Sequence, residues 1–132
     1  MSQVELGEID YVGIDIVPEV ITSNKEKYPG KKFLLADIIQ DPLPSSDLVL
    51  CKDCFIHLRN KDVARVIGNF KNCGIKWMLA STYPVDFNKQ ILTGHYRPVN
   101  LELTPFNLPA PIEKIADHAH DGTERYLGLW EL

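Results

Sequence analysis

Apolar runs recur along the first two thirds of the chain and are separated by polar, turn-rich stretches. They occupy residues 11–16, 32–37, 47–52 and 77–82, and each of the first three ends near an aspartate. Nearly continuous apolar runs of this length are typical of strands covered on both faces, as in parallel sheets. The pattern therefore predicts four parallel strands, of which the last two are neighbours.

Two helices are predicted between these strands. The first begins at Pro18 and Glu19, which suit a first helical turn, and it stops before Pro29. The second has Asn60 as its predicted N-cap, apolar residues at helical spacing, and Gly74 just past its end. Alternation of strands and helices predicts a mainly parallel sheet with right-handed crossovers.

The pattern changes after the fourth strand. Residues 95–111 hold four of the nine prolines, which predicts an extended, ordered loop. Residues 112–117 and 125–132 are predicted as strands joined by a turn at 118–124, which adds an antiparallel hairpin.

Length and charge narrow the class of protein. A chain of 132 residues predicts one domain, here spanning 1–132. The net charge of −4 and the absence of a basic run disfavour nucleic acid and anionic membranes as partners. No apolar stretch approaches the roughly 20 residues of a membrane helix, and the N-terminal residues lack a signal-peptide core. Three cysteines without a secretory signal predict reduced thiols and a cytoplasmic location.

Three acids mark the ends of the predicted strands. Asp15, Asp37 and Asp53 follow successive apolar runs, and ligands of open α/β sheets bind beyond the carboxyl ends of the strands. A carboxylate there can accept two hydrogen bonds from a ribose diol, and charge-assisted bonds of this kind are strong. The acid of the next strand can accept from an adenine amino group beside an apolar residue such as Ile38.

These motifs resemble those of class I S-adenosylmethionine-dependent methyltransferases. "VGIDI" at 12–16 is similar to their ribose-binding strand, and "FLLADIIQDPLP" at 33–44 to the strand with the adenine-contacting acid. "DLVLCKDCFIHL" at 47–58 is similar to their fourth-strand motif, and the tail from 95 onward to a bacterial subgroup. The resemblance implies a Rossmann-like three-layer α/β sandwich with S-adenosyl-L-methionine as cofactor.

The resemblance also implies residue roles in methyl transfer to an acceptor, a small molecule being favoured. The implied cofactor-binding residues are Asp15, Ile16, Asp37, Ile38 and Asp53, and the implied catalytic residues are Asp53 and His57. A histidine there serves as a base or orients the acceptor. Each residue also has a plain structural interpretation, because strand-end acids start turns or cap helices and histidines pack against backbone.

One family feature is missing from the sequence. Class I methyltransferases open with a strand and a G-x-G-x-G turn, whose glycines let the backbone approach the cofactor; nothing before Tyr11 supplies them. A truncated sequence explains this most economically; closing up of the remaining strands and coverage by another chain are the alternatives. Because 11–16 and 47–52 would each lose a neighbour, a homodimer is predicted. A non-catalytic remnant or interaction subunit is the alternative function.

Other signals point elsewhere less strongly. Cys51 and Cys54 form a C-x-x-C motif, but Cys51 falls inside a predicted strand and is interpreted as a buried apolar residue. Zinc needs two further close ligands, and His118 and His120 fall in a predicted turn, so no metal site is predicted. Asp15 also suits a nicotinamide dinucleotide, although the fourth-strand motif and the tail favour methyl transfer.

Overall fold

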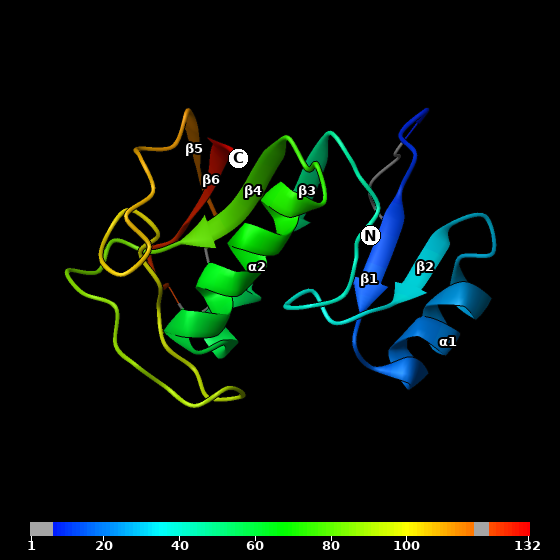
Figure 1. Cartoon of the computed structure of the whole chain (residues 1–132), viewed down its shortest axis with the longest axis horizontal. Coiled ribbons are helices and arrows are strands. Elements are labelled where there is room, and N and C mark those ends of the chain that lie inside the picture. The colour runs from blue at the N-terminus through cyan, green and yellow to red at the C-terminus, as the bar shows by residue number, and fades with distance from the viewer. Residues whose placement is uncertain (1–6, 118–121) are drawn as a thin grey trace. The chain divides into compact units, whose positions relative to one another are not determined.

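The computed structural model describes residues 7–117 and 122–132 (Figure 1). Within these residues the chain forms six strands, two α-helices and one short 3-10 helix. It divides into two compact units, Met1–Leu43 and Pro44–Leu132, each with its own sheet.

The first unit is one strand–helix–strand motif. Its elements are β1 (Val12–Asp15), α1 (Pro18–Lys27) and β2 (Lys32–Leu35). The strands are parallel, as predicted, with Asp15 opposite Leu35. They end before 16 and 37 because Asp15 and Asp37 begin turns: each carboxylate accepts the backbone N–H two residues ahead.

A small core holds this unit together. Phe33 of β2 and Ile21 of α1 are buried. A Cβ on Gly13 would lie 2.6 Å from the Phe33 ring, so the glycine is what lets this ring pack against β1. Tyr11 meets the same ring edge-to-face, with 6.1 Å between the ring centroids.

The second unit carries a four-stranded sheet in the order β3-β4-β6-β5. Its elements are β3 (Leu48–Cys51), the 3-10 helix (Phe55–His57), α2 (Asn60–Asn72), β4 (Trp77–Thr82), β5 (Glu113–Ala116) and β6 (Tyr126–Glu131). β3 and β4 are parallel neighbours, and β6 runs antiparallel to both β4 and β5. The predicted pairing and hairpin are thus confirmed; residues 118–121 of the predicted turn lie outside the described residues.

Helix α2 lies along β3 and β4 and supplies much of the core (Figure 1). Its buried apolar residues follow helical spacing as predicted: Val63, Val66, Ile67 and Phe70. The predicted N-cap was wrong by one residue: Arg59 occupies the N-cap position, and its side chain makes no capping hydrogen bond. Asn60 is the first helical residue, and its side-chain oxygen instead accepts a bond from buried Arg97.

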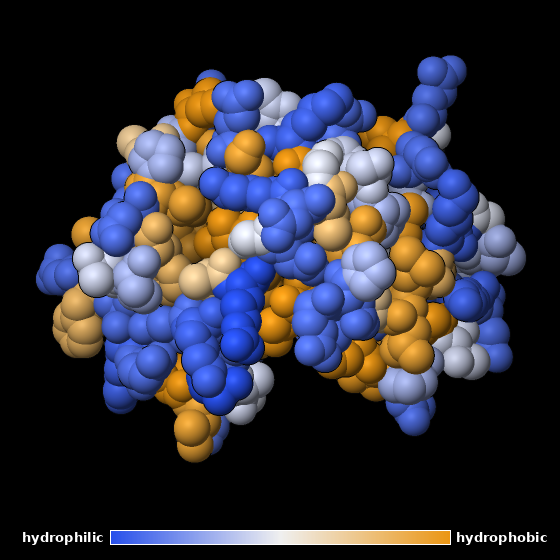
Figure 2. All heavy atoms as spheres, viewed as in Figure 1, coloured by the Kyte–Doolittle hydropathy of each residue, from blue (hydrophilic) through white to orange (hydrophobic). Residues whose placement is uncertain are grey.

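Both units expose apolar side chains. Figure 2 shows hydrophobic surface over the region of β1 and β2, where Leu35 is 56% exposed. On β3, Leu48 and Leu50 are 49% and 60% exposed. The register places Leu50 beside Leu79 of β4, so this apolar row continues across the sheet.

The sheet edges show where the family's first strand, which the sequence lacks, would be expected to pair. No strand precedes β1 within residues 7–11. Among the described residues, β1 pairs only with β2 and β3 pairs only with β4. Neither described α-helix combines the length and the hydropathy needed to cross a bilayer.

Residues 95–111 contain no helix or strand, as predicted, and the same irregular structure extends over residues 84–112. Its backbone and side chains are bonded to the rest of the second unit: Tyr83 N–H donates to the Val99 carbonyl at 2.8 Å. Buried Val99 and Leu101 anchor it in the core.

Candidate functional site

Two of the predicted acids, Asp15 and Asp37, lie at the same edge of the first unit. Asp15 ends β1, and Asp37 lies two residues beyond the end of β2. The Ala36 N–H donates to the Asp15 carbonyl at 3.0 Å, so the two chains remain paired up to this point. Both aspartates are half-buried. The parallel pairing therefore brings them to the same carboxyl edge, where the sequence placed them.

Each carboxylate keeps an acceptor position open. Asp15 Oδ1 accepts the Val17 N–H at 2.9 Å, and no described residue donates to its Oδ2. Asp37 Oδ1 accepts the Ile39 N–H at 2.9 Å in the same way. An ionised carboxylate has room for several donors, so serving the turn leaves capacity for a hydroxyl or amino group. Ile16 beside them is 62% exposed, and this set of groups fits an adenosine moiety.

Two hollows of this unit differ in their relation to the two acids. A shallow one of about 350 Å³ follows the outer side of α1, between Pro18 and Glu26, and touches none of the predicted residues. A cavity of about 80 Å³ borders Asp15 but is lined mainly by core residues such as Ile21 and Phe33. The acids thus stand at an open edge of the first unit.

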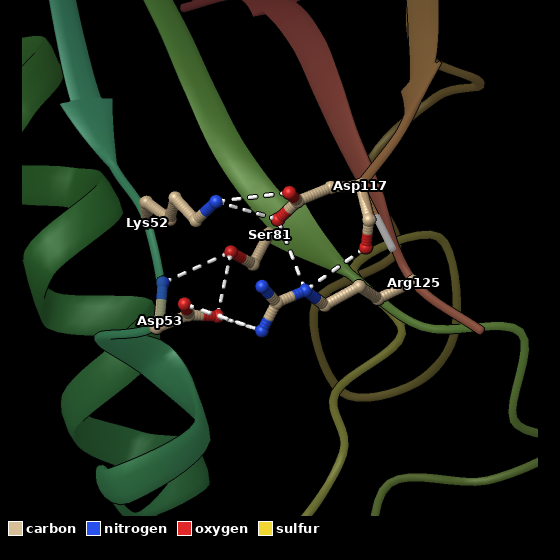
Figure 3. A network of polar contacts seen from close by, with 5 residues as sticks. All are labelled: Lys52, Asp53, Ser81, Asp117 and Arg125. Carbon is tan, nitrogen blue, oxygen red and sulfur yellow. Dashed lines mark hydrogen bonds and ion pairs between the residues drawn. The ribbon is translucent and has the colours of Figure 1, made fainter. Parts of the chain in front are cut away.

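In the second unit, Asp53 belongs to a charged network (Figure 3). Its backbone has φ 54°, a left-handed conformation that is uncommon outside glycine. Its N–H donates to Ser81 Oγ at 2.9 Å, and Arg125 Nη1 contacts its two carboxylate oxygens at 3.1 and 3.3 Å. Ser81 of β4 and Arg125, which directly precedes β6, therefore hold the turn that follows β3.

The network continues to the end of β5. Arg125 Nε donates to the Asp117 carbonyl and forms an ion pair with its carboxylate, both at 3.0 Å. Lys52 Nζ lies 2.9 and 2.8 Å from the two carboxylate oxygens. The Lys52 bond, with a smaller contribution from Arg125, holds the pKa of Asp117 below its usual value. Two cations and two carboxylates are thus paired with one another (Figure 3).

This pairing bears on the predicted roles of Asp53. Both carboxylate oxygens already contact Arg125, so a ligand would share them with a guanidinium. The contacts make Asp53 a structural link between β3 and the hairpin, whatever else it binds. Its cofactor-binding and catalytic roles stay predictions.

His57 lies at the end of the 3-10 helix in the same unit. Its ring is exposed, and Nδ1 lies 3.1 Å from the His95 carbonyl oxygen. The Tyr96 ring stands beside it, with 6.2 Å between centroids. Tyr83, which follows β4, bonds Arg125, and its burial raises the pKa of its phenol. An imidazole therefore stands exposed on a turn that the loop after β4 contacts directly.

The cysteines follow their structural interpretation. Cys51 ends β3 and is buried. A hydrogen bond with Cys54 and burial both raise its pKa above that of an ordinary thiol, which disfavours the reactive thiolate. Within the described ranges no three histidine, cysteine or acidic side chains gather as a metal site would require. His118 and His120 lie outside those ranges.

The comparisons place the chain in a family. The sequence profile described as "Methyltransferase domain" matches residues 2–75, more than half of the chain. The chain belongs to this methyltransferase-domain family. The match covers both strand-end acids of the first unit and extends through Asp53 and His57. No functionally curated protein sequence gives a significant match.

Solved structures confirm the Rossmann-like α/β fold of this methyltransferase-domain chain. Magnesium protoporphyrin IX methyltransferase from Synechocystis PCC 6803, with bound SAH, matches with a TM-score of 0.67 and 13% identity over 91% of this chain and 62% of that chain. A 1,6-didemethyltoxoflavin-N1-methyltransferase from Burkholderia thailandensis gives 0.66 and 13% over 92% and 60%. The PH0226 protein of Pyrococcus horikoshii OT3 gives 0.62 and 14% over 94% and 72%.

The chain therefore spans about three fifths of the length of the first of these enzymes. The described part before β1 holds no strand, and residues 1–11 contain no G-x-G-x-G motif.

Two arginines that bond to distant parts of the second unit were not predicted from the sequence. Arg125 and Arg97 were not singled out, although the first contacts Asp53 and the second is 2% exposed. Their only sequence signal is an arginine beside an apolar strand and another inside a proline-rich loop. Neither pattern indicates a partner, because Phe55 lies 42 residues from Arg97 and Asp53 lies 72 residues from Arg125.

Proposed function

We propose that this chain is the S-adenosyl-L-methionine-binding part of a methyltransferase that acts on a small molecule. One observation carries the proposal: the family match covers Asp15 and Asp37, and the structure brings both to one carboxyl edge with acceptor positions open. Names of similar structures support the acceptor class, since they include a protoporphyrin and a toxoflavin methyltransferase.

The proposed roles follow the chemistry of each group. Asp15 accepts the hydroxyls of the ribose, and Asp37 accepts the adenine amino group. Ile16 and Ile38 cover the adenine ring. The fifth proposed cofactor contact is Asp53, whose carboxylate would then serve Arg125 and the ligand together.

When bound, the cofactor supplies a sulfonium methyl group. The acceptor's lone pair forms the new bond to carbon, and the pair of the broken carbon–sulfur bond stays on sulfur. For an acceptor with an O–H or N–H, the proposed role of His57 is to take the proton as this bond forms. Asp53 is proposed to fix the turn ahead of His57, and most of the rate would come from orientation and exclusion of water.

A non-catalytic interaction subunit is the second candidate. The contacts of Asp53 favour it, because both carboxylate oxygens are already paired with Arg125. A single domain over 1–132, a homodimer and a cytoplasmic location complete the proposal. The dimer rests on the open edges of β1 and β3 among the described strands.

Calorimetry with S-adenosylhomocysteine tests cofactor binding. Asp15→Ala is expected to weaken binding by about 1.5–3 kcal/mol, the value of a lost charged hydrogen bond. Asp10→Ala is the matched control: it removes an exposed carboxylate of the same unit, whose partner is Lys32, and should leave affinity unchanged. Absence of binding at millimolar ligand would contradict the proposal for this chain and favour the interaction subunit.

A further inference from the structure

The turn that carries His57 is bonded by a distant segment of the loop, residues 94–97. The Gly94 N–H donates to the His57 carbonyl at 2.8 Å. The Arg97 N–H donates to the Ile56 carbonyl at 3.1 Å. The backbone on both sides of the imidazole is thus tied to one short stretch of chain.

The buried Arg97 side chain donates further hydrogen bonds to the same turn. Nη1 donates to the Phe55 carbonyl at 2.6 Å and Nη2 to the Leu58 carbonyl at 2.8 Å. Nη2 also donates to Asn60 Oδ1 at 2.6 Å, and Nε to the Lys89 carbonyl at 3.0 Å. Arg97 is 2% exposed, and these four acceptors, three carbonyls and one side-chain amide oxygen, are all neutral. A buried cation solvated by carbonyl groups is costly to form and hard to replace.

The carbonyls of residues 55–58 therefore all accept bonds from Gly94 or Arg97. Four consecutive carbonyls held in this way leave the turn little freedom. Lysine has neither the planar fork nor enough donors in that geometry to reproduce the set.

The same segment determines which nitrogen of the neutral His57 ring carries the proton. A carbonyl oxygen only accepts hydrogen bonds, so the contact of His57 Nδ1 with the His95 carbonyl requires the proton on Nδ1. In the neutral ring the lone pair then lies on Nε2. His57 is exposed, and the tautomer fixed in this way is the one that receives a proton at Nε2.

We propose that residues 94–97 position His57, with Arg97 as the principal positioning residue, and that they hold its ring in the Nδ1–H tautomer with Nε2 as the proton acceptor. This inference rests on the proposed function for its catalytic meaning. It assigns the site to acceptors that carry a proton to lose, such as a hydroxyl or an amine N–H. Its structural content stands on the free protein.

Nitrogen NMR of the histidine rings tests this assignment without cofactor, so its outcome is independent of S-adenosylhomocysteine binding. His57→Gln assigns the signals. At alkaline pH, where imidazoles are neutral, the wild type is expected to show a protonated Nδ1 and an unprotonated Nε2 at His57. Arg97→Lys is expected to lose this preference and give a mixture of tautomers. A wild-type ring protonated at Nε2 would overturn the proposal.

Gly94→Ala provides a second variant in case Arg97→Lys does not fold. Gly94 has φ 94° and Gly122 has φ 78°, and an added Cβ at either would meet nothing within 4 Å. The two alanine variants are thus strained alike, but only Gly94 is bonded to the His57 carbonyl. Loss of the tautomer preference in Gly94→Ala alone supports the proposal. An unchanged ring in Gly94→Ala, or an equal change in Gly122→Ala, would overturn it.

Discussion

A buried acid, Asp62, stabilises the N-terminal turn of α2. Its carboxylate accepts Arg59 Nε at 2.7 Å and Thr93 Oγ1 at 3.3 Å, and its side chain is only 2% exposed. The Arg59 bond is the main reason that the pKa of Asp62 lies below its ordinary value. The position in the first turn of a helix adds a favourable interaction with the helix dipole.

The pH dependence of stability follows from the direction of this shift. Because the folded pKa lies below the unfolded value of about 3.9, the unfolded state binds more protons in that range. The contribution is complete above the unfolded pKa and is lost as the pH falls through the folded one. Asp62→Asn should lower the free energy of unfolding by about 1–3 kcal/mol at neutral pH and flatten its acid dependence.

Urea unfolding from neutral to acidic pH measures both effects. Asp47→Asn is the control, because Asp47 is 84% exposed in its ion pair with Lys76 and such pairs contribute little. Equal acid slopes for the wild type and Asp62→Asn would contradict the assignment.

At the scale of elements, strand β6 requires glycine at position 128, because the Trp130 ring packs directly against it. A Cβ on Gly128 would lie 2.4 Å from the Trp130 ring. The ring has little room to move, because it is 1% exposed and its Nε1 donates to the Pro109 carbonyl at 2.8 Å. β6 pairs with both β4 and β5, so a displaced ring disturbs the centre of the sheet.

Gly128→Ala is expected to destabilise the protein by about 1–3 kcal/mol, the usual cost of overpacking. Gly68→Ala is the matched control: it lies within α2 and an added Cβ meets nothing within 4 Å, so a gain of about 0.5–1 kcal/mol is expected. Chemical denaturation of both variants measures the difference. A neutral Gly128→Ala would show that the tryptophan adapts without cost.

At the scale of the whole molecule, the described strands leave two apolar edges without a described partner. β3 carries exposed Leu48 and Leu50 and pairs on one side with β4. β1 pairs on one side with β2. Apolar edges without a partner favour pairing with another chain, and closed twofold pairing is the commonest result.

Light scattering during size-exclusion chromatography is expected to give twice the chain mass of 15.0 kDa. Leu50→Lys should shift the protein toward the monomer, because a lysine opposes edge pairing. Leu92→Lys places the same charge on the loop, at a leucine that is 67% exposed, and should leave the mass unchanged. A monomer at every micromolar concentration would contradict the proposed dimer.

The sequence by itself determined the order of the strands and helices along the chain, the parallel pairs, the terminal hairpin and the shared edge of Asp15 and Asp37. These follow from local signals: apolar runs, helix starts and acids that begin turns. It also resembled the family that the profile match confirms. It did not determine that the described strands form two sheets or that β6 lies between β4 and β5. The boundaries of the strands were less well predicted, because side-chain bonds at Asp15 and Asp37 end the ladders early.

Only the tertiary structure decided the polar contacts of the second unit. In the folded chain Arg125 contacts Asp53, 72 positions away, and Arg97 contacts Phe55, 42 positions away. The N-cap of α2 is Arg59 and not the predicted Asn60. An arginine's partners depend on which distant carbonyls and carboxylates the folded backbone brings within reach of its fork. Local pattern carries no information on that choice, because the side chain bonds equally well to many acceptors.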